Sequence, residues 1–306
     1  MSSLRIVSFL PAATEMIYLL GLGDDLVGRT FECDYPEEVL EKSVVIDCAI
    51  DLFGMSPKEI DAAVGRQLSA GKSLYTVDEE RLMDLAPDLL VTQNLCQVCA
   101  ASGCEVSQVL KTMVRAPKII WQTPRTFDDV LDQVSILGRE TGTEAKADAW
   151  LEAAVARTQR IAAATQVLPK VRVAFLEWVD PVFSAGHWIP RMLEWAGAED
   201  LNSRRGTDSV KVTWEQIVDF RPEVVVVAPC GFKMSQSLKQ AEHLVSNPGW
   251  GQLPAVKAGR VYAVDANAYF ARPGPRLIDG VELLAHLIHP ELFGWTGPPD
   301  AYAVVV

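Results

Sequence analysis

The sequence predicts an α/β protein made of two lobes with parallel sheets. The chain has 306 residues, which exceeds the usual size of one domain. Its first half repeats an apolar run, turn residues and an amphipathic stretch, a pattern typical of βα units around a parallel sheet. The pattern restarts after one long alanine-rich stretch. We therefore expect an N-terminal lobe over residues 1–143, a connecting helix over 144–167 and a C-terminal lobe over 168–306.

In the N-terminal lobe, the helix that follows Met55 has the clearest start. Ser56 is a good N-cap, Pro57 suits the first helical position and Glu59 supplies the carboxylate of a capping box. Apolar runs predict strands at Arg5–Leu10, Leu26–Arg29, Asp88–Thr92 and Lys118–Trp121. Amphipathic stretches predict helices at Ala12–Leu22, from Ser56 to about Ala70, and at Asp78–Leu85, Ser107–Val114 and Thr126–Arg139.

The connecting helix is predicted from composition. Residues 144–166 are rich in alanine and contain no Gly or Pro, and Pro169 ends the stretch. In the C-terminal lobe, strands are predicted at Arg172–Trp178, Glu223–Ala228 and Arg260–Val264. Helices are predicted at Ile189–Ala196, Trp214–Phe220, Ser235–Val245 and Pro275–Leu287.

Composition and charge exclude several classes of protein. Hydrophobic residues make up 49% of the chain and charged residues 22%, which is the composition of an ordinary globular protein. The net charge of -12 argues against a nucleic-acid partner, which a basic surface would attract. No stretch reaches the roughly 18 uncharged apolar residues of a membrane-spanning helix. We expect no membrane insertion, and a monomer.

The N-terminal apolar run, Ile6–Leu10, starts too early to be the body of a secretory signal peptide. With Met1 as the native start, the sequence predicts a cytoplasmic protein. A chain from which a signal segment had been removed would look the same and would be periplasmic or a lipoprotein.

Five segments carry a resemblance to a known family. They are residues 5–15 (RIVSFLPAATE), 34–36 (DYP), 86–92 (APDLLVT), 183–186 (FSAG) and 270–276 (FARPGPR). Together they resemble the class III substrate-binding proteins that serve ABC importers of cobalamin, haem and ferric siderophores, and most of all the cobalamin-binding branch. The resemblance implies two Rossmann-like lobes, a rigid connecting helix and a ligand held in the inter-lobe cleft.

The function that the resemblance implies is ligand binding without chemistry. The expected ligand is a cobalamin (vitamin B12) or a related corrinoid, with haem or a ferric chelate as the alternative. An ABC permease is the implied partner of an exported chain. By motif matching, Glu80 and Glu215 fall where such relatives carry one acidic residue in each lobe to meet permease arginines. The alternative for Glu215 is compensation of a helix dipole.

Strand ends supply the candidate ligand-binding residues, because ligands of open parallel sheets bind beyond the carboxyl ends of the strands. Pro11, Ala12 and Thr14 open a helix whose N–H groups favour a polar or anionic ligand edge, although Thr14 is equally suited to capping. Gln93 and Asn94 follow a predicted strand.

Aromatic residues at strand ends suit a wide, flat and largely apolar ligand such as a corrinoid. By motif matching, Trp178 and Tyr269 take positions where cobalamin-binding relatives present aromatic walls. Trp188, Phe270 and Arg272 stand in or beside the same motifs. The alternative for each aromatic residue is the hydrophobic core.

Two positions depart from those relatives, since Glu32 and Gln93 stand near places where the relatives carry aromatic residues. His187 follows Gly186 and is a candidate to coordinate a metal centre axially or to hydrogen-bond a ligand amide. The alternative is a structural histidine.

A cysteine cluster follows the predicted strand that ends at Thr92. Its members, Cys96, Cys99 and Cys104, are spaced so that they are candidate ligands of zinc or a soft metal, and Cys96 is also a candidate ligand contact. A dithiol redox pair and partly buried thiols are the alternatives. The competing function is therefore a cysteine-dependent metal-binding or thiol-redox protein on the same fold.

Overall fold

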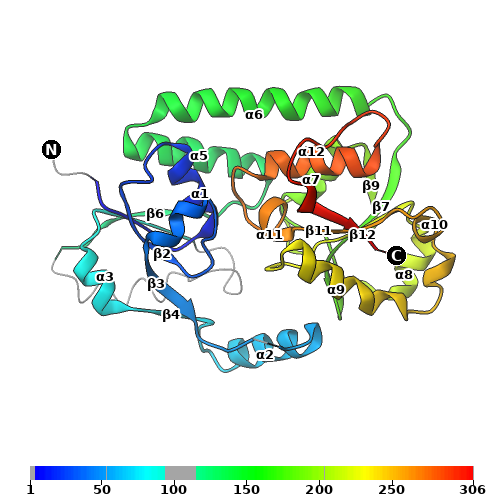
Figure 1. The fold of residues 1–306 in the computed structure, drawn as a ribbon, viewed down its shortest axis with the longest axis horizontal. Coiled ribbons are helices and arrows are strands. Elements are labelled where there is room, and N and C mark those ends of the chain that lie inside the picture. Colours follow the sequence, from blue (N-terminus) through cyan, green and yellow to red (C-terminus); the bar gives the residue numbers. More distant parts are fainter. Residues whose placement is uncertain (1–3, 53, 94–114, 203, 306) are drawn as a thin grey trace. The chain divides into compact units, whose positions relative to one another are not determined.

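The computed structural model describes residues 4–52, 54–93, 115–202 and 204–305. The chain divides into two compact units. Unit 1 comprises Met1–Pro124 and Asp129–Ala149, and unit 2 comprises Arg125–Asp128 and Trp150–Val306. Helix α6 (Glu144–Thr165) begins in unit 1 and continues into unit 2 (Figure 1). The predicted helix at 107–114 lies outside the described residues.

Unit 1 is built on a six-stranded sheet with the order β4-β3-β2-β1-β5-β6. Its strands are β1 (Ile6–Ser8), β2 (Leu26–Thr30), β3 (Ser43–Cys48), β4 (Tyr75–Val77), β5 (Leu89–Thr92) and β6 (Lys118–Trp121). Neighbouring strands are parallel except β4, which runs antiparallel to β3. The β1–β5 register pairs Ile6 with Leu89 and Ser8 with Val91.

The helices of unit 1 begin where their local sequences satisfy free N–H groups. In α2 the Ser56 side chain accepts from the Glu59 N–H while the Glu59 side chain accepts from the Ser56 N–H, which confirms the predicted capping box. The helices are α1 (Pro11–Leu19), η1 (Glu37–Glu41), α2 (Pro57–Ser69), α3 (Glu79–Leu85) and α5 (Phe127–Thr141), which begins in unit 2.

Unit 2 is built on a second sheet with the order β12-β11-β10-β7-β8, and β9 also pairs with β7. The strands are β7 (Val171–Val179), β8 (Val182–Ser184), β9 (Ala198–Asp200), β10 (Val224–Val227), β11 (Val261–Val264) and β12 (Tyr302–Val304). β8 and β12 are antiparallel to their neighbours, and the other pairs are parallel.

The helices of unit 2 flank this sheet and follow its strands in chain order (Figure 1). They are α7 (Ile189–Trp195), α8 (Trp214–Phe220), α9 (Met234–Val245), η2 (Trp250–Gln252), α10 (Pro254–Lys257), α11 (Ala266–Tyr269), α12 (Leu277–Ile288) and η3 (Pro299–Ala301). Within the described part of the chain, no helix combines the length and the apolar character that a membrane span requires.

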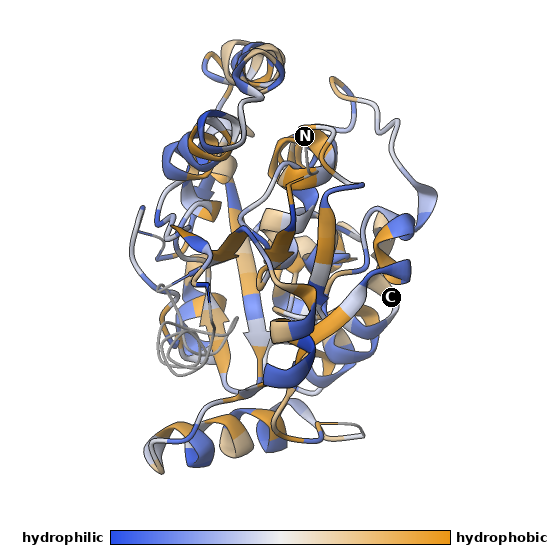
Figure 2. Ribbon diagram, turned by 90° about the vertical axis from the view of Figure 1, so that its left-hand side faces the viewer, coloured by the Kyte–Doolittle hydropathy of each residue, from blue (hydrophilic) through white to orange (hydrophobic). Residues whose placement is uncertain are grey.

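Each sheet has its own hydrophobic core. In unit 1, Val7, Phe9 and Leu90 pack with Ile46 and Leu82. In unit 2, all four residues of β10 are buried, as expected of a central parallel strand covered on both faces. The strands appear as largely hydrophobic ribbons in Figure 2.

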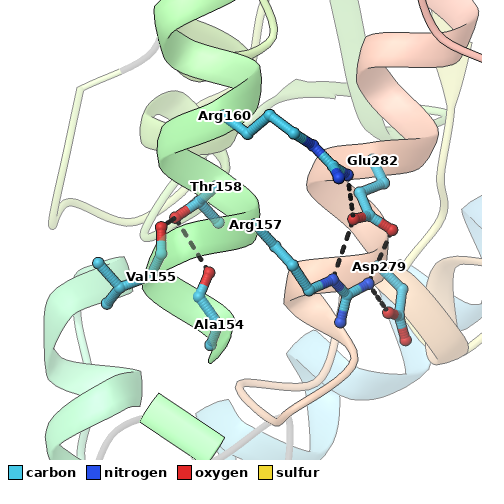
Figure 3. Close-up of polar contacts among 7 residues, drawn as sticks. All are labelled: Ala154, Val155, Arg157, Thr158, Arg160, Asp279 and Glu282. Carbon is cyan, nitrogen blue, oxygen red and sulfur yellow. Dashed lines mark hydrogen bonds and ion pairs between the residues drawn. The ribbon is translucent and has the colours of Figure 1, made fainter. Parts of the chain in front are cut away.

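An ion-pair network joins α6 to α12 inside unit 2 (Figure 3). The Arg157 guanidinium donates to both oxygens of Glu282, at 2.9 and 2.7 Å, and to Oδ1 of Asp279 at 2.5 Å. Arg160 adds a longer contact of 3.5 Å to Glu282. Hydrogen bonds to Glu282 are the largest cause that raises the pKa of Arg157, although partial burial opposes them. This network fixes the second half of α6 on α12.

The predicted fold class is confirmed, since two α/β units and a connecting helix are present. Two details of the sheets differ from the prediction. The sheets are not purely parallel, because β4, β8 and β12 are antiparallel additions. β3, β4, β8 and β9 were not predicted, since each is short or partly exposed and lacks a long apolar run.

Arg157→Met should lower the free energy of unfolding by about 1–2 kcal/mol, because it leaves two half-buried carboxylates without their shared donor. Chemical denaturation measures the change. Arg160→Met is the matched control and should cost less than about 0.5 kcal/mol, since the Arg160 side chain is 73% exposed. Equal losses of stability from the two substitutions would show that Arg157 is not the residue that holds α6 on α12.

Candidate functional site

The topology places a ligand-binding edge on each sheet. In unit 1, the chain leaves β1 toward β2 on one side and leaves β5 toward β6 on the other, so the strand order reverses between β1 and β5. In unit 2, β7 leads to β8 and β9 on one side, and β10 leads to β11 on the other. Ligands of open α/β sheets bind at the carboxyl ends of strands at such a reversal.

At the reversal in unit 1, α1 starts directly beyond β1. Pro11 is its first helical residue, and the Phe9 N–H donates to Val91 O at 2.9 Å, which ties the turn to β5. Pro11, Ala12 and Thr14 are buried, and Thr14 Oγ1 lies 3.1 Å from Cys33 Sγ. Gln93 follows β5 and is also buried.

A buried arginine shapes the loop that follows β2. The Arg29 guanidinium donates to three backbone carbonyls, those of Thr30, Cys33 and Leu40, at 3.1 to 3.3 Å. Since one rigid group holds three points of the loop, the path of residues 30–40 depends on it. Glu32 lies half-buried in this loop.

Three exposed aromatic residues at this end of the unit 1 sheet were missed as site residues. Phe31 is 39% exposed, Tyr35 is 50% exposed and Trp121 is 42% exposed. Phe31 follows β2 directly and Trp121 ends β6, whose register pairs it with Thr92. Large exposed rings at strand ends are candidates for ligand contact, and sequence alone does not reveal exposure.

At the reversal in unit 2, Trp178 lies near the end of β7 and packs against Phe232, with ring centroids 5.5 Å apart. The indole N–H of Trp178 donates to Asp180 O at 3.2 Å. Cys230, an exposed free thiol, follows β10, and its N–H donates to Glu177 O at 3.2 Å. Phe232 was not predicted as a site residue.

The loop that follows β8 holds His187 in a left-handed backbone conformation, with φ of 51°. The His187 N–H donates to Thr207 O at 2.7 Å and its carbonyl accepts from the Gly206 N–H at 3.0 Å. Nε2 lies 3.2 Å from Asp208 Oδ1. Burial lowers the pKa of His187 despite the opposing effect of Asp208, which favours the neutral imidazole at pH 7.

Glu177 lies beneath this loop, one residue before Trp178. Its carboxylate accepts from the Gly186 N–H at 3.0 Å and from the Ser209 side chain. Burial raises the pKa of Glu177 to about 7, and Asp200 raises it further while the two hydrogen bonds oppose the shift. A carboxyl group that titrates near neutral pH thus joins two loops.

The remaining predicted aromatic residues of unit 2 form one buried cluster. Trp188 donates its indole N–H to Phe270 O at 2.7 Å, and Phe270 packs edge-on against Phe175 at 5.2 Å. Tyr269 packs edge-on against Trp295, and burial raises its pKa to about 12. Arg272 is half-buried. The structure brings these residues together as packing partners.

The predicted docking carboxylates are both exposed. Glu80 lies in the first turn of α3 and Glu215 in the first turn of α8. Hydrogen bonds with its own backbone and with Thr213 lower the pKa of Glu215, which keeps it ionised at neutral pH. Asn94, Cys96, Cys99 and Cys104 lie outside the described residues. Across residues 4–52, 54–93, 115–202 and 204–305, no three His, Cys, Asp or Glu side chains form a metal-binding group.

Comparison with known proteins defines the class. The periplasmic binding protein family model matches residues 6–268. An uncharacterized ABC transporter substrate-binding lipoprotein of Bacillus subtilis, YvrC, is 28% identical over 94% of this chain and 81% of its own. A vitamin B12-binding protein of Vibrio cholerae is 24% identical over 91% and 86%. The crystal structure of a periplasmic heme-binding protein from Pseudomonas aeruginosa has a TM-score of 0.72 at 19% identity, covering 99% of this chain and 98% of that one.

The fold and its two strand-end edges define a binding protein of the α/β type. This chain belongs to the periplasmic binding protein family. The prediction of a cytoplasmic location is wrong, because the family is one of periplasmic proteins and the Bacillus relative is a lipoprotein. The early position of the first apolar run was insufficient ground for that prediction.

Arg29→Met should lower the free energy of unfolding by about 2–4 kcal/mol, because three carbonyls lose a charged donor inside the protein. Chemical denaturation followed by circular dichroism measures it. Arg66→Met, at an exposed position of α2, is the matched control and should change stability by less than about 0.5 kcal/mol. A loss below that value at Arg29 would show that the loop does not depend on it.

Proposed function

We propose that this chain is a non-enzymatic substrate-binding protein that delivers a cobalamin or a related corrinoid to an ABC importer. The observation that carries the proposal is the set of aromatic rings at the carboxyl ends of strands, with Trp178 and Phe232 in unit 2 and Phe31 and Trp121 in unit 1. Relatives named vitamin B12-binding proteins, which align over about nine-tenths of the chain, support the choice of ligand.

The rings fit the physical demands of such a ligand. A corrinoid is a broad disc with apolar faces and a rim of amide groups, so tight binding requires aromatic contact on its faces and hydrogen bonds at its edge. His187, held with its neutral imidazole beside Asp208, offers an edge contact. Glu32 and Gln93 offer further polar contacts after β2 and β5, and Arg272 offers one after α11.

The exposed carboxylates support the partner in this proposal. Glu80 and Glu215 stand at the first turns of short helices in separate units. Two exposed carboxylates suit recognition of arginines, which bind carboxylates in a bidentate way. We propose that they contact the permease of the importer and take no part in holding the ligand.

Titration calorimetry with cyanocobalamin tests the ligand directly. The protein should bind it with one-to-one stoichiometry, and Trp178→Ala should weaken binding at least about tenfold, since loss of a ring contact costs more than about 1.4 kcal/mol. Trp214→Ala is the matched control and should leave the affinity unchanged, because Trp214 packs on Trp250 and donates to Pro248 O.

A parallel titration with haemin decides between ligand classes. The proposal predicts weaker binding of haemin than of cyanocobalamin. Tighter binding of haemin, or no binding of cyanocobalamin at high micromolar concentration, would contradict the assignment of a corrinoid.

A further inference from the structure

Two loops of unit 2 meet above the carboxyl group of Glu177. The first is residues 184–188, which follows β8 and carries His187 and Trp188. The second is residues 204–211, which precedes α8. We call them the histidine loop and the clasp loop. The Glu177 carboxylate accepts from Gly186 in the histidine loop and from Ser209 in the clasp loop, so one side chain of β7 bonds to both.

The two loops are held to each other by backbone contacts at several points. His187 exchanges two backbone hydrogen bonds with Thr207 and Gly206, and the Ser184 N–H donates to Val210 O at 2.9 Å. Their approach is so close at Gly186 that a Cβ there would lie 2.4 Å from Ser209 N. A β-bridge between Phe183 and Lys211 extends the contact. Displacing one loop therefore disturbs the other.

The backbone of His187 shows why this contact needs support. A left-handed φ in a residue other than glycine costs about 1 kcal/mol and persists only where surrounding contacts impose it. Those contacts are the two bonds with the clasp loop, together with the anchoring of the neighbouring Gly186 on Glu177. The orientation of His187 thus depends on a side chain that lies ten residues earlier.

We propose that Glu177 is a positioning residue, which holds the histidine loop in its ligand-binding conformation and makes that conformation sensitive to pH. The proposal rests on the proposed function in one respect only, namely that the histidine loop contacts the ligand. The hydrogen bonds between Glu177 and the two loops, which we call the clamp, are present in the protein without ligand.

The charges around Glu177 fix the direction of the pH dependence. Asp200 on β9 raises its pKa. His187 and Asp208 lie in the loops above it, and Cys230 follows β10. We call the state in which both loops are hydrogen-bonded to Glu177 the closed state. In this state burial raises the pKa of Glu177 to about 7, against 4.5 for a solvated carboxyl group. A raised pKa means that the closed state binds the proton more tightly, so closure is favoured at low pH and is weakened as pH rises through 7.

Hydrogen exchange of backbone amides in the ligand-free full-length protein tests the clamp. After correction for the intrinsic rate, protection of the histidine loop, taken as a ratio to that of Glu177→Gln, should fall at least about tenfold between pH 5 and pH 8, since opening lets Glu177 ionise in water. The ratio removes the opposite contribution of His187, whose lowered pKa weakens the loop at low pH in both proteins. Glu177→Gln keeps an acceptor for Gly186 and cannot titrate, so its protection should not fall over that range. A ratio that does not change with pH would overturn the proposal.

Glu223→Gln is the matched control. Glu223 also accepts from a backbone N–H, that of Arg172 at 3.1 Å, but at the opposite end of the same sheet. This variant should keep the wild-type pH dependence of the histidine loop. Loss of the dependence in the control would assign it to the unit as a whole and refute a local role of Glu177.

Cyanocobalamin affinity links the clamp to binding. At pH 7, Glu177→Ala should weaken binding at least tenfold, whereas Glu177→Gln should stay within about threefold of the wild type. Wild-type affinity in Glu177→Ala would overturn the positioning role. If the wild type itself does not bind cyanocobalamin, the proposed ligand fails, and the exchange experiment still decides whether Glu177 controls the loop.

Discussion

The strand order of each sheet reverses beside its central strand, β1 in unit 1 and β7 in unit 2. The two strands beside the reversal send their connections to opposite sides of the sheet. No connection therefore crosses over the carboxyl ends of these two strands, and a ligand can bind there. In unit 2 this brings Trp178, near the end of β7, against Phe232, after β10. The contact between Trp178 and Phe232 depends on that constraint, whereas the other proposed binding residues lie at neighbouring strand ends and in the loops.

Charged side chains fix the loops at these strand ends. Arg29 holds three carbonyls of the loop after β2, and Glu177 holds an N–H and a hydroxyl of the loops above β7. Partly or fully buried charges are costly unless each is well hydrogen-bonded. The terminal guanidinium nitrogens of Arg29 and the carboxylate of Glu177 have loop partners, so the cost of burial is offset only when the loops keep their conformation. Rigid loops reduce the entropy lost when a ligand binds.

Local patterns predicted much of this fold from the sequence. Each of these features is encoded by residues that are neighbours in the sequence. They are the capping box at Ser56, the alanine-rich α6 and the apolar β5 and β10. The edge strand β4 and the short β8 and β9 depend on pairing with distant segments, which periodicity does not encode. For the candidate site, Trp178 was predicted from its place near a strand end and remains a proposal. Phe31, Trp121 and Glu177 were missed, because their roles rest on exposure or on long-range hydrogen bonds.

The central claim is that a corrinoid binds at the strand ends where the sheets reverse. A crystal structure of the protein with cyanocobalamin tests it most directly. The account predicts the corrin ring in van der Waals contact with Trp178 and with other residues at or beyond the carboxyl ends of β1, β2, β5, β6, β7 or β10. Ligand at the amino ends of the strands, or in the polar pocket beside Arg157 and Trp295, would contradict it.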